Sequence, residues 1–319
     1  MSAFAIDAHN LTKVFAGGVT AVDRLDLRVR SGSIYGLIGP NGAGKTTALR
    51  LLMGLLRPES GTARILGTEL WDAPRSVRSR VVYISQTQQL PIWMTLEELC
   101  RYAAHLYERW DAAHAQVLAR RWSLKRSQQL GRMSVGDQRK ASLVVAFAAR
   151  AQVLLLDEPA AGLDPITRRA LVDEIVEMAS RGEECTVLFS THLLEDLERV
   201  VDHVGIMDQG HLIVSSPLDD LRSTVKRVQV VFPGDTVPAG FAIPGALWSE
   251  NAGPVATALT RLINEAQLDS IRHWPGARVH VFPLSLEEIL LAFFKNNPLG
   301  QAAQDFQTDS PLSNPSNLL

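Results

Sequence analysis

The sequence predicts an α/β protein built on a parallel sheet, with a small α+β domain near its C-terminus. Residues 34–38 and 153–156 are short apolar runs, and each is followed by polar residues and then by a segment with helical periodicity. A third apolar run, residues 186–189, leads into a helix expected from about Leu193. Strands that alternate with helices in this way indicate a parallel sheet covered by helices.

The first 30 residues predict an antiparallel layer ahead of this sheet. Apolar and polar side chains alternate at Phe4 and Ile6 and again over residues 25–29, which is the period of a half-buried strand. Gly17 and Gly18 lie between these stretches and are typical of a turn that joins two strands.

Three further segments are expected to be helical. The first should end at Pro58 and carries an apolar face at Leu49, Leu52, Met53 and Leu56. Residues 95–130, which are rich in charge, form the second. Residues 166–181, with apolar side chains on one face, form the third.

A change of pattern near residue 222 predicts a domain boundary. We expect a main domain at residues 1–222, a small α+β domain at 225–296, and a disordered tail at 297–319, where Gln, Ser, Asn and Pro are frequent. The elements expected in the small domain are a strand at 227–232, a helix at 255–268, a strand at 277–282 and a helix at 286–294.

Composition argues against two kinds of function. Of the 319 residues, 46% are hydrophobic and 21% are charged, and the net charge of -2 gives no basic field for nucleic acid. No run approaches the roughly 18 apolar residues of a membrane span, and residues 1–10 lack the features of a signal peptide. Cys100 and Cys185 are too few for a disulfide framework or a metal cluster, and we expect buried thiols.

A glycine-rich segment after the first apolar run matches the phosphate-binding pattern G-x-x-x-x-G-K-[ST]. Its residues are Gly39, Pro40, Asn41, Gly42, Ala43, Gly44, Lys45 and Thr46, and Thr47 follows. The glycines let backbone N–H groups turn toward phosphate oxygens, and the N-terminus of the next helix adds a positive dipole. We expect Lys45 to reach the β- and γ-phosphates and the Thr46 hydroxyl to bind Mg²⁺.

Two adjacent acids, Asp157 and Glu158, follow the apolar run 153–156. They should lie at the carboxyl edge of the sheet, where open α/β sheets bind ligands. Asp157 suits the Mg²⁺ shell, and Glu158 suits a general base that orients an attacking water. The alternative is two solvated acids at a strand end, which the nearby phosphate-binding loop disfavours. Together the two motifs predict a phosphate-loop nucleoside triphosphatase.

The other motifs make residues 1–222 resemble the nucleotide-binding domain of the ABC ATPase family. The phosphate loop reads GPNGAGKTT. The other matching segments, in the family's order, are Gln86 of the Q-loop, residues 133–140 of the signature, 154–159 of the second Walker motif, 161–164 of the D-loop and 190–192 of the switch. This resemblance implies an antiparallel β subdomain and a helical subdomain at about 88–150.

The resemblance implies a role for each motif around a shared nucleotide. Ser134 and the N–H of Gly136, at the start of a helix, would contact the γ-phosphate of ATP bound to a second subunit. His192 would hydrogen-bond the γ-phosphate and hold Glu158 and the water in place. Gln86 would contact Mg²⁺ and the water.

Two further residues receive roles from the same resemblance. Asp164 would link the two nucleotide sites across the subunit interface. Phe15 stands where the family places an aromatic residue that stacks on adenine. The alternative for Phe15 is a core position.

The signature departs from the family's LSGGQ, although Ser134 and Gly136 are kept. The replacements are Met133 for Leu, Val135 for the first Gly and Asp137 for Gln. Asp137 adds a negative charge near a γ-phosphate site, which should weaken ATP capture unless Arg139 or Lys140 compensates.

The resemblance also implies two partners. One is a second nucleotide-binding subunit, either the same chain or a paralogue, and the other is an integral membrane permease that holds the chain at the cytoplasmic side of the plasma membrane. Residues 90–94, Leu-Pro-Ile-Trp-Met, are apolar for a loop and would receive a coupling helix of the permease, unless they fold inward. Residues 283–289 resemble the SLEE-type end of bacterial exporter ATPases, which favours export.

The sequence therefore predicts an ATP-hydrolysing subunit that drives transport through a separate permease. One alternative is a soluble ABC-family ATPase in translation or DNA repair. Such members carry tandem domains or long coiled coils between the Walker motifs, and neither is present here. Another is a regulatory module that binds ATP without turnover, which the presence of Glu158 and His192 disfavours.

Overall fold

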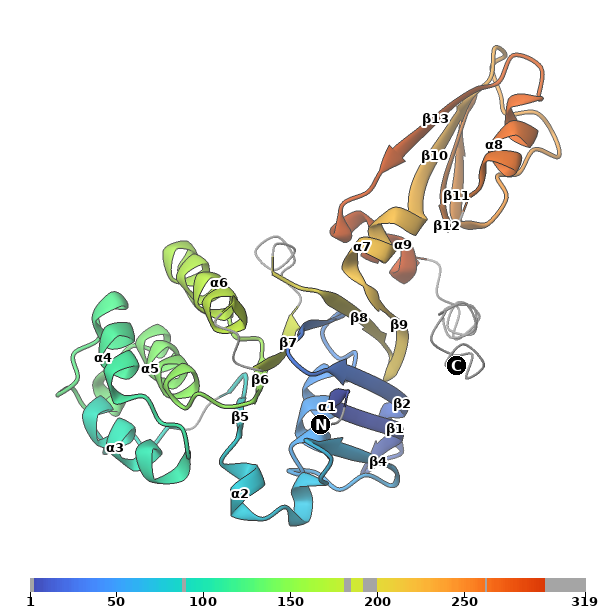
Figure 1. Ribbon diagram of the computed structural model, residues 1–319. Helices are drawn as coiled ribbons and strands as arrows, with labels where there is room; N and C mark the ends of the chain where they lie inside the picture. The colour runs from blue at the N-terminus through green and yellow to red at the C-terminus, as the bar shows by residue number, and fades with distance from the viewer. Residues whose placement is uncertain (1–2, 88–89, 181–184, 192–199, 262, 296–319) are drawn as a thin grey trace. The chain divides into compact units, whose positions relative to one another are not determined.

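The computed structural model describes residues 3–87, 90–180, 185–191, 200–261 and 263–295. They form two compact units, which divide between Ser215 and Ser216. The first unit contains two sheets and the second contains one, and helices accompany each unit (Figure 1). The predicted α/β class is confirmed.

An antiparallel sheet of three strands opens the first unit. Its order is β2-β1-β4, and its strands are β1 (Phe4–Phe15), β2 (Val19–Arg30) and β4 (Ser60–Ile65). Buried apolar residues alternate with exposed ones along β2, which is the period that the sequence shows. The expected turn is present, because Gly17 and Gly18 adopt φ values of 92° and 79° between β1 and β2.

The second sheet of this unit has six strands in the order β5-β6-β7-β3-β8-β9. They are β3 (Ile34–Ile38), β5 (Val81–Ile84), β6 (Val153–Asp157), β7 (Thr186–Thr191), β8 (His203–Asp208) and β9 (His211–Pro217). The pairs from β5 to β8 are parallel. Every residue of β3 and β6 is buried, as continuous apolar strands require when helices cover both faces.

Six α-helices accompany these sheets in the described part of the first unit. They are α1 (Lys45–Leu52), α2 (Arg75–Arg78), α3 (Leu96–Leu106), α4 (Ala112–Arg121), α5 (Val135–Ala148) and α6 (Pro165–Ser180), with short 3₁₀ turns at Leu70–Asp72 and Leu130–Arg132. Helices α3, α4 and α5 pack together. Helix α1 packs against both sheets, and one core cluster contains Leu27, Tyr35, Leu49 and Leu155. The expected helix from about Leu193 lies outside the described residues.

The expected helix after the phosphate loop is shorter than predicted. It ends at Leu52, with Met53 as its C-cap, and does not continue to Leu56. Gly54 explains the early end because its φ is 66°, and a Cβ there would lie 2.5 Å from the backbone nitrogen of Trp71. The apolar side chains beyond the helix still pack on the core from the following turn.

The second unit is an antiparallel sheet with three helices. The sheet order is β11-β12-β10-β13, and its strands are β10 (Val225–Val231), β11 (Ala246–Ala252), β12 (Val255–Arg261) and β13 (Arg278–Pro283). The helices are α7 (Leu218–Thr224), α8 (Glu265–Arg272) and α9 (Leu286–Lys295). Phe232, Phe241 and Trp274 meet edge to face within its core, with centroids 4.8 to 6.5 Å apart.

The prediction of a helix at 255–268 is wrong. Residues 255–261 form β12, which pairs with β10 on one side and β11 on the other, and β11 itself was not predicted. Within β12 the residues Ala256, Ala258 and Thr260 are at most 3% exposed, which is a period of two, and Leu259 between them is 8% exposed. The helix begins at Glu265, because Asn264 and Gln267 form a capping box there.

The SLEE-like segment has a local structural role. The Ser285 N–H donates to Glu288 Oε2 at 2.9 Å, and the Glu288 N–H donates to Ser285 Oγ at 3.2 Å. This reciprocal pair caps the start of α9, and Leu284 and Leu286 on either side of Ser285 are buried. Glu288 also pairs with Arg227 of β10, which ties α9 to the sheet.

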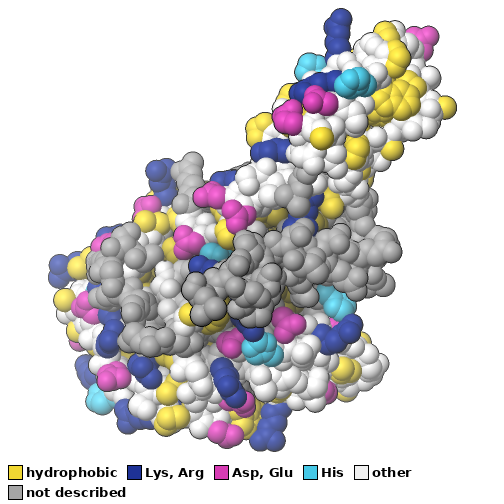
Figure 2. All heavy atoms as spheres, turned by 45° about the vertical axis from the view of Figure 1, so that its right-hand side comes forward, with side chains coloured by type: hydrophobic (Ala, Val, Ile, Leu, Met, Phe, Trp, Pro, Cys, Tyr) yellow, Lys and Arg dark blue, Asp and Glu magenta, His cyan; other side chains and the backbone are white. Residues whose placement is uncertain are grey.

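Two surface properties bear on the class of protein. None of the helices in the described part of the chain has the length and hydropathy that a membrane span requires. On the face drawn in Figure 2, basic and acidic side chains are interspersed over the first unit, in line with the small net charge of the chain.

Candidate functional site

The glycine-rich loop connects the carboxyl end of β3 to the start of α1. Two of its glycines are required by close backbone contacts. A Cβ on Gly39 would lie 2.2 Å from the carbonyl oxygen of Met207, and one on Gly44 would lie 2.2 Å from that of Ala21. Gly44 is the N-cap of α1 and supplies no capping side chain, so the first N–H groups of the helix are placed for an anion.

Lys45 is the first residue of α1 and is buried. Its Nζ donates to the carbonyl oxygens of Gly39 at 2.7 Å and Pro40 at 3.1 Å, and lies 3.7 Å from Glu158 Oε1. Burial lowers the pKa of Lys45, while the negative charges of Glu158 and Asp157 oppose that shift. The loop thus holds an ammonium group inside its own curve.

Asp157, at the end of β6, is fully buried and accepts two hydroxyl hydrogen bonds on one oxygen. Thr46 Oγ1 donates to Asp157 Oδ1 at 3.0 Å, and Ser190 Oγ donates to the same oxygen at 2.6 Å. Asp157 Oδ2 is buried and has no hydrogen-bond partner among the described residues. A buried carboxylate oxygen left over beside a threonine hydroxyl fits a hard cation that takes few protein ligands.

Glu158 follows in a strained backbone conformation, with a φ of 48°. Its N–H donates to Ser190 Oγ at 3.0 Å and to the Ser190 carbonyl oxygen at 3.2 Å. The side chain is 6% exposed. The structure therefore gathers Lys45, Thr46, Asp157 and Glu158 at one sheet edge, as the two sequence motifs require.

The signature segment begins α5. Ser134 is exposed and caps the helix, because its Oγ accepts from the Asp137 N–H at 3.1 Å and donates to Asp137 Oδ2 at 2.9 Å. Lys140 Nζ lies 3.3 Å from Asp137 Oδ1, so Lys140 is the cation that faces this charge. Arg139, the other cation considered, points inward instead and is buried.

The D-loop lies beside the signature within the same chain. A Cβ on Gly136 would be 3.5 Å from the carbonyl oxygen of Gly162. Asp164 accepts from the Thr167 N–H at 3.0 Å and from Thr167 Oγ1 at 2.6 Å, and these bonds lower the pKa of Asp164. Lys140 Nζ is 4.0 Å from Asp164 Oδ2, so it reaches acids of both segments.

The remaining predicted residues lie apart from this cluster or outside the described residues. Gln86 is exposed in a bend after β5 and has no hydrogen bond to Thr46 or Asp157. Phe15 is 42% exposed at the end of β1, with Lys13 Nζ 5.7 Å from its ring centroid, so it is not a core residue. His192 lies outside the described residues.

Residues 90–94 do not fold inward at their centre. Ile92 is 60% exposed and Trp93 is 69% exposed. Backbone hydrogen bonds fix the segment, because the N–H of Gly131 donates to the Ile92 carbonyl at 3.0 Å and that of Leu130 to the Met94 carbonyl at 2.8 Å. The loop thus presents two large apolar side chains on a fixed backbone.

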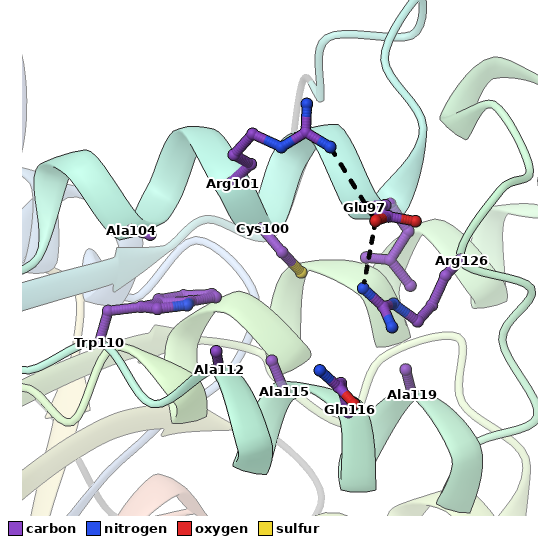
Figure 3. Close-up of a pocket in the computed structure, with 11 residues that line it drawn as sticks. Glu97, Cys100, Arg101, Ala104, Trp110, Ala112, Ala115, Gln116, Ala119 and Arg126 are labelled. Atoms are coloured by element: carbon purple, nitrogen blue, oxygen red, sulfur yellow. Dashed lines mark ion pairs between the residues drawn. The ribbon is translucent and has the colours of Figure 1, made fainter.

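A separate pocket of about 250 Å³ lies between α3 and α4 (Figure 3). Glu97 on its rim pairs with Arg101 and Arg126 at 3.9 and 3.5 Å. The Cys100 thiol lines it, and burial raises the pKa of Cys100 to about 11, so little thiolate exists at neutral pH. Helices α3 and α4 lie on the side of the first unit away from α1 (Figure 1).

Comparison with known proteins agrees with this geometry. A model of the family described as ABC transporter matches residues 22–161. The Nod factor export ATP-binding protein I of Burkholderia lata is 35% identical over 213 residues, which cover 65% of this chain and 69% of that protein. The chain belongs to the ABC transporter ATP-binding proteins.

Other relatives of this ABC transporter ATP-binding protein extend the comparison. The ABC transporter ATP-binding protein YtrB of Bacillus subtilis (strain 168) is 29% identical, and the match covers 91% of this chain and 98% of YtrB. A solved ATP-binding subunit of an ABC transporter has 31% identity and a TM-score of 0.62, covering 69% of this chain and 92% of that one. The dimeric structure of the ATP-binding cassette MJ0796 bound to ADP and Pi shares the fold. It is 19% identical with a TM-score of 0.60, and the match covers 67% of this chain and 98% of that one.

The predicted family, fold class and ATPase activity are therefore confirmed. The protein binds and hydrolyses ATP as the subunit that drives an ABC transporter, and the alternatives of a translation or repair ATPase are not supported. Sequence reasoning named two further residues within the switch and the signature but missed that they hold the acids. They are Ser190, in the polar end of β7, and Arg139, a charge on the inward face of α5.

Proposed function

We propose that this ABC transporter ATP-binding protein works as half of an ATP-clamped dimer that drives export through a separate permease. The observation that carries the proposal is that the predicted nucleotide-binding residues lie in two separate places on the chain. Lys45 and Glu158 lie together at the sheet edge, whereas Ser134 lies exposed at the start of α5. A helix N-terminus capped by a serine is suited to a phosphate that another copy supplies.

Residues on both sides of the nucleotide have complementary tasks in this proposal. Residues 39–47 hold the phosphates of ATP, and Phe15 stacks on the adenine. Ser134 and Gly136 of a second copy, or of a paralogue, cover the γ-phosphate. The D-loop residue Asp164 connects the two sites through the interface.

Hydrolysis rests on Glu158 as the general base, with His192 and Gln86 assisting at the γ-phosphate. The Glu158 carboxylate accepts the proton of the attacking water, and Lys45 stays near the phosphates to offset their charge. Thr46 and Asp157, and from the loop Gln86, are the proposed ligands of Mg²⁺. When bound, Mg²⁺ neutralises phosphate charge.

The fit to Mg²⁺ follows from the donor set. Asp157 Oδ2 is buried without a hydrogen-bond partner in the described part of the chain, and Thr46 Oγ1 is within 3.0 Å of the same carboxylate. No cluster of three or more His, Cys, Asp or Glu side chains forms among the described residues. One carboxylate with one hydroxyl suits Mg²⁺, which keeps waters and substrate phosphates as its other ligands.

The partner on the membrane side is proposed to be a permease that seats a coupling helix on residues 90–94. Ile92 and Trp93 give this surface two exposed apolar anchors. The chain would then sit at the cytoplasmic side of the plasma membrane. Export is proposed because the relative from Burkholderia lata is named for Nod factor export.

The domain bounds complete the proposal. Residues 1–222 would form the nucleotide-binding domain, with its helical subdomain at about 88–150, and residues 225–296 the C-terminal extension. The match to YtrB covers 91% of this chain, so that relative also continues well beyond residue 222.

The dimer is tested with a catalytically blocked chain. Glu158→Gln should slow hydrolysis by on the order of 10²- to 10⁴-fold and trap a dimer with Mg²⁺ and ATP, visible by light scattering after size exclusion. Ser134→Asp in the same background keeps a good N-cap but places a negative charge against the γ-phosphate. It should abolish the dimer, whereas Ser134→Asn, a neutral cap, should retain it. A blocked chain that stays monomeric beside its permease would refute the clamp.

A further inference from the structure

Arg139 is a buried cation whose contacts are all to backbone carbonyl groups near the hydrolytic acids. The side chain is 7% exposed and comes from the second turn of α5. Its Nη2 donates to the carbonyl oxygens of Asp157 and Glu158, each at 2.8 Å. Nη1 donates to the Ser85 carbonyl oxygen at 2.5 Å, and Nε to that of Pro159 at 3.4 Å.

These contacts join two segments that end neighbouring parallel strands. Ser85 follows β5 and directly precedes Gln86, while Asp157 ends β6. One planar guanidinium therefore fixes the backbone at the start of the Q-loop and the backbone of both acids. A lysine could not do the same, because a single ammonium group lacks the rigid fork that reaches acceptors in several directions.

Glu158 is held on both sides of its α-carbon. Its N–H is fixed by Ser190, and its carbonyl oxygen is fixed by Arg139. The residue also has a φ of 48°, a conformation that persists only where the surroundings hold it. Fixing the peptide groups on both sides of Glu158 sets the direction in which its side chain points.

The electrostatic setting is unusual for a residue that only fills space. Burial lowers the pKa of Arg139, and the charges of Asp157 and Glu158 oppose that shift. A buried charge is costly unless it is paired and hydrogen-bonded, and an apolar side chain fills a core at lower cost. The guanidinium satisfies this need with four carbonyl dipoles and two nearby carboxylates.

We propose that Arg139 is a positioning residue for ATP hydrolysis, which sets the Glu158 carboxylate and the start of the Q-loop in one register. This inference rests on the proposed role of Glu158 as the general base. It predicts that Arg139 acts on the rate of the chemical step and not on the binding of ATP. It also links α5, which Ser134 begins, to the hydrolytic acids of its own chain.

The experiment compares Arg139→Lys and Arg139→Gln with the wild-type full-length chain, and uses Arg120→Lys at an exposed position of α4 as the matched control. For each protein, kcat and KM for ATP, the Kd for a fluorescent ATP analogue and the thermal midpoint are measured. Both Arg139 variants should lose roughly ten- to hundredfold in kcat, as expected for a displaced catalytic group. Kd should change less than about twofold, and the control should match wild type.

A second readout separates positioning from support of the fold. Combined with Glu158→Gln, the Arg139→Lys variant should still form the Mg²⁺-ATP dimer, because capture of ATP does not need the base. Unchanged kcat in a folded Arg139→Lys or Arg139→Gln protein would overturn the proposal. The proposal would also fail if ATP affinity, dimer formation and the thermal midpoint all fell together with kcat, since Arg139 would then only support the fold. If hydrolysis survived Glu158→Gln in a chain that keeps Arg139, Glu158 would instead not be the general base.

Discussion

Replacing Ser190 with alanine removes the hydroxyl that joins the two acids of the site. Ser190 Oγ donates to Asp157 Oδ1 at 2.6 Å and accepts from the Glu158 N–H at 3.0 Å. Asp157 Oδ1 keeps the Thr46 hydroxyl as a donor, and the Glu158 N–H keeps the Ser190 carbonyl as an acceptor. Two hydrogen bonds are lost, but each remaining atom retains a partner, so the main cost is that of the buried hydrogen bond to the charged Asp157.

The magnitude follows from that count. A buried hydrogen bond to a charged group contributes about 1.5–3 kcal/mol to the free energy of unfolding. For a unit of this size, each kcal/mol corresponds to about 2–4 °C in the thermal midpoint. We therefore expect Ser190→Ala to lower the midpoint by roughly 4–8 °C for a loss near 2 kcal/mol. The Mg²⁺ concentration for half-maximal hydrolysis should rise, because Asp157 loses one of its two orienting donors.

The matched control is Ser142→Ala on α5. Ser142 is also buried, but its hydroxyl donates to the neutral carbonyl oxygen of Gln138 at 3.0 Å. Its loss should cost about 1 kcal/mol at most, which the better helix propensity of alanine partly offsets. Calorimetry and a Mg²⁺ titration of ATPase activity measure both variants. If Ser190→Ala behaved like Ser142→Ala in both assays, the account of Ser190 would be refuted.

Three further predictions concern other parts of the first unit. Trp93→Ala should uncouple transport in vesicles that contain the permease while ATPase activity of the isolated chain survives, and intact transport would contradict the docking surface. Asp137→Gln should shift the ATP dependence of dimer formation to lower concentration, because a charge beside the γ-phosphate is removed; a shift to higher concentration would oppose this view. Glu174→Gln breaks the ion pair between the fully buried Glu174 carboxylate and Arg121 Nη1 at 2.9 Å and should cost about 1.5–3 kcal/mol in thermal unfolding, whereas Asp173→Asn on the exposed side of α6 should cost less than about 0.5 kcal/mol.

The parts of the site that the sequence predicts are the local ones. The phosphate loop is one continuous segment of the sequence. The pattern G-x-x-x-x-G-K-[ST] therefore predicts its position and its need for glycine directly. Asp157 and Glu158 follow an apolar strand, so their position at the sheet edge could be inferred from the strand alone. Ser134 could be expected at a helix start, because a serine with an acid three residues later is an N-terminal signal.

The missed parts depend on contacts between distant segments. Arg139 reaches Ser85, 54 residues away, and Ser190 reaches Asp157 across 33 residues. No spacing rule predicts such a contact without the strand order. In the second unit, the sequence predicts a helix at 255–268, whereas pairing with strands on both sides makes residues 255–261 a strand.

Helix α5 brings the two halves of the proposed cycle onto one rigid element. Its N-cap, Ser134, is exposed and is proposed to meet a nucleotide on another subunit, and Arg139, five residues later, holds the carbonyl oxygens of Asp157 and Glu158 in its own subunit. A push on Ser134 by a captured γ-phosphate would therefore be transmitted along one and a half turns of hydrogen-bonded helix to the hydrolytic base. Because Arg139 also holds the Ser85 carbonyl oxygen, the same displacement would reach the start of the Q-loop. Coupling between ATP capture, hydrolysis and transport then needs no long chain of contacts, since a single side chain joins the three segments.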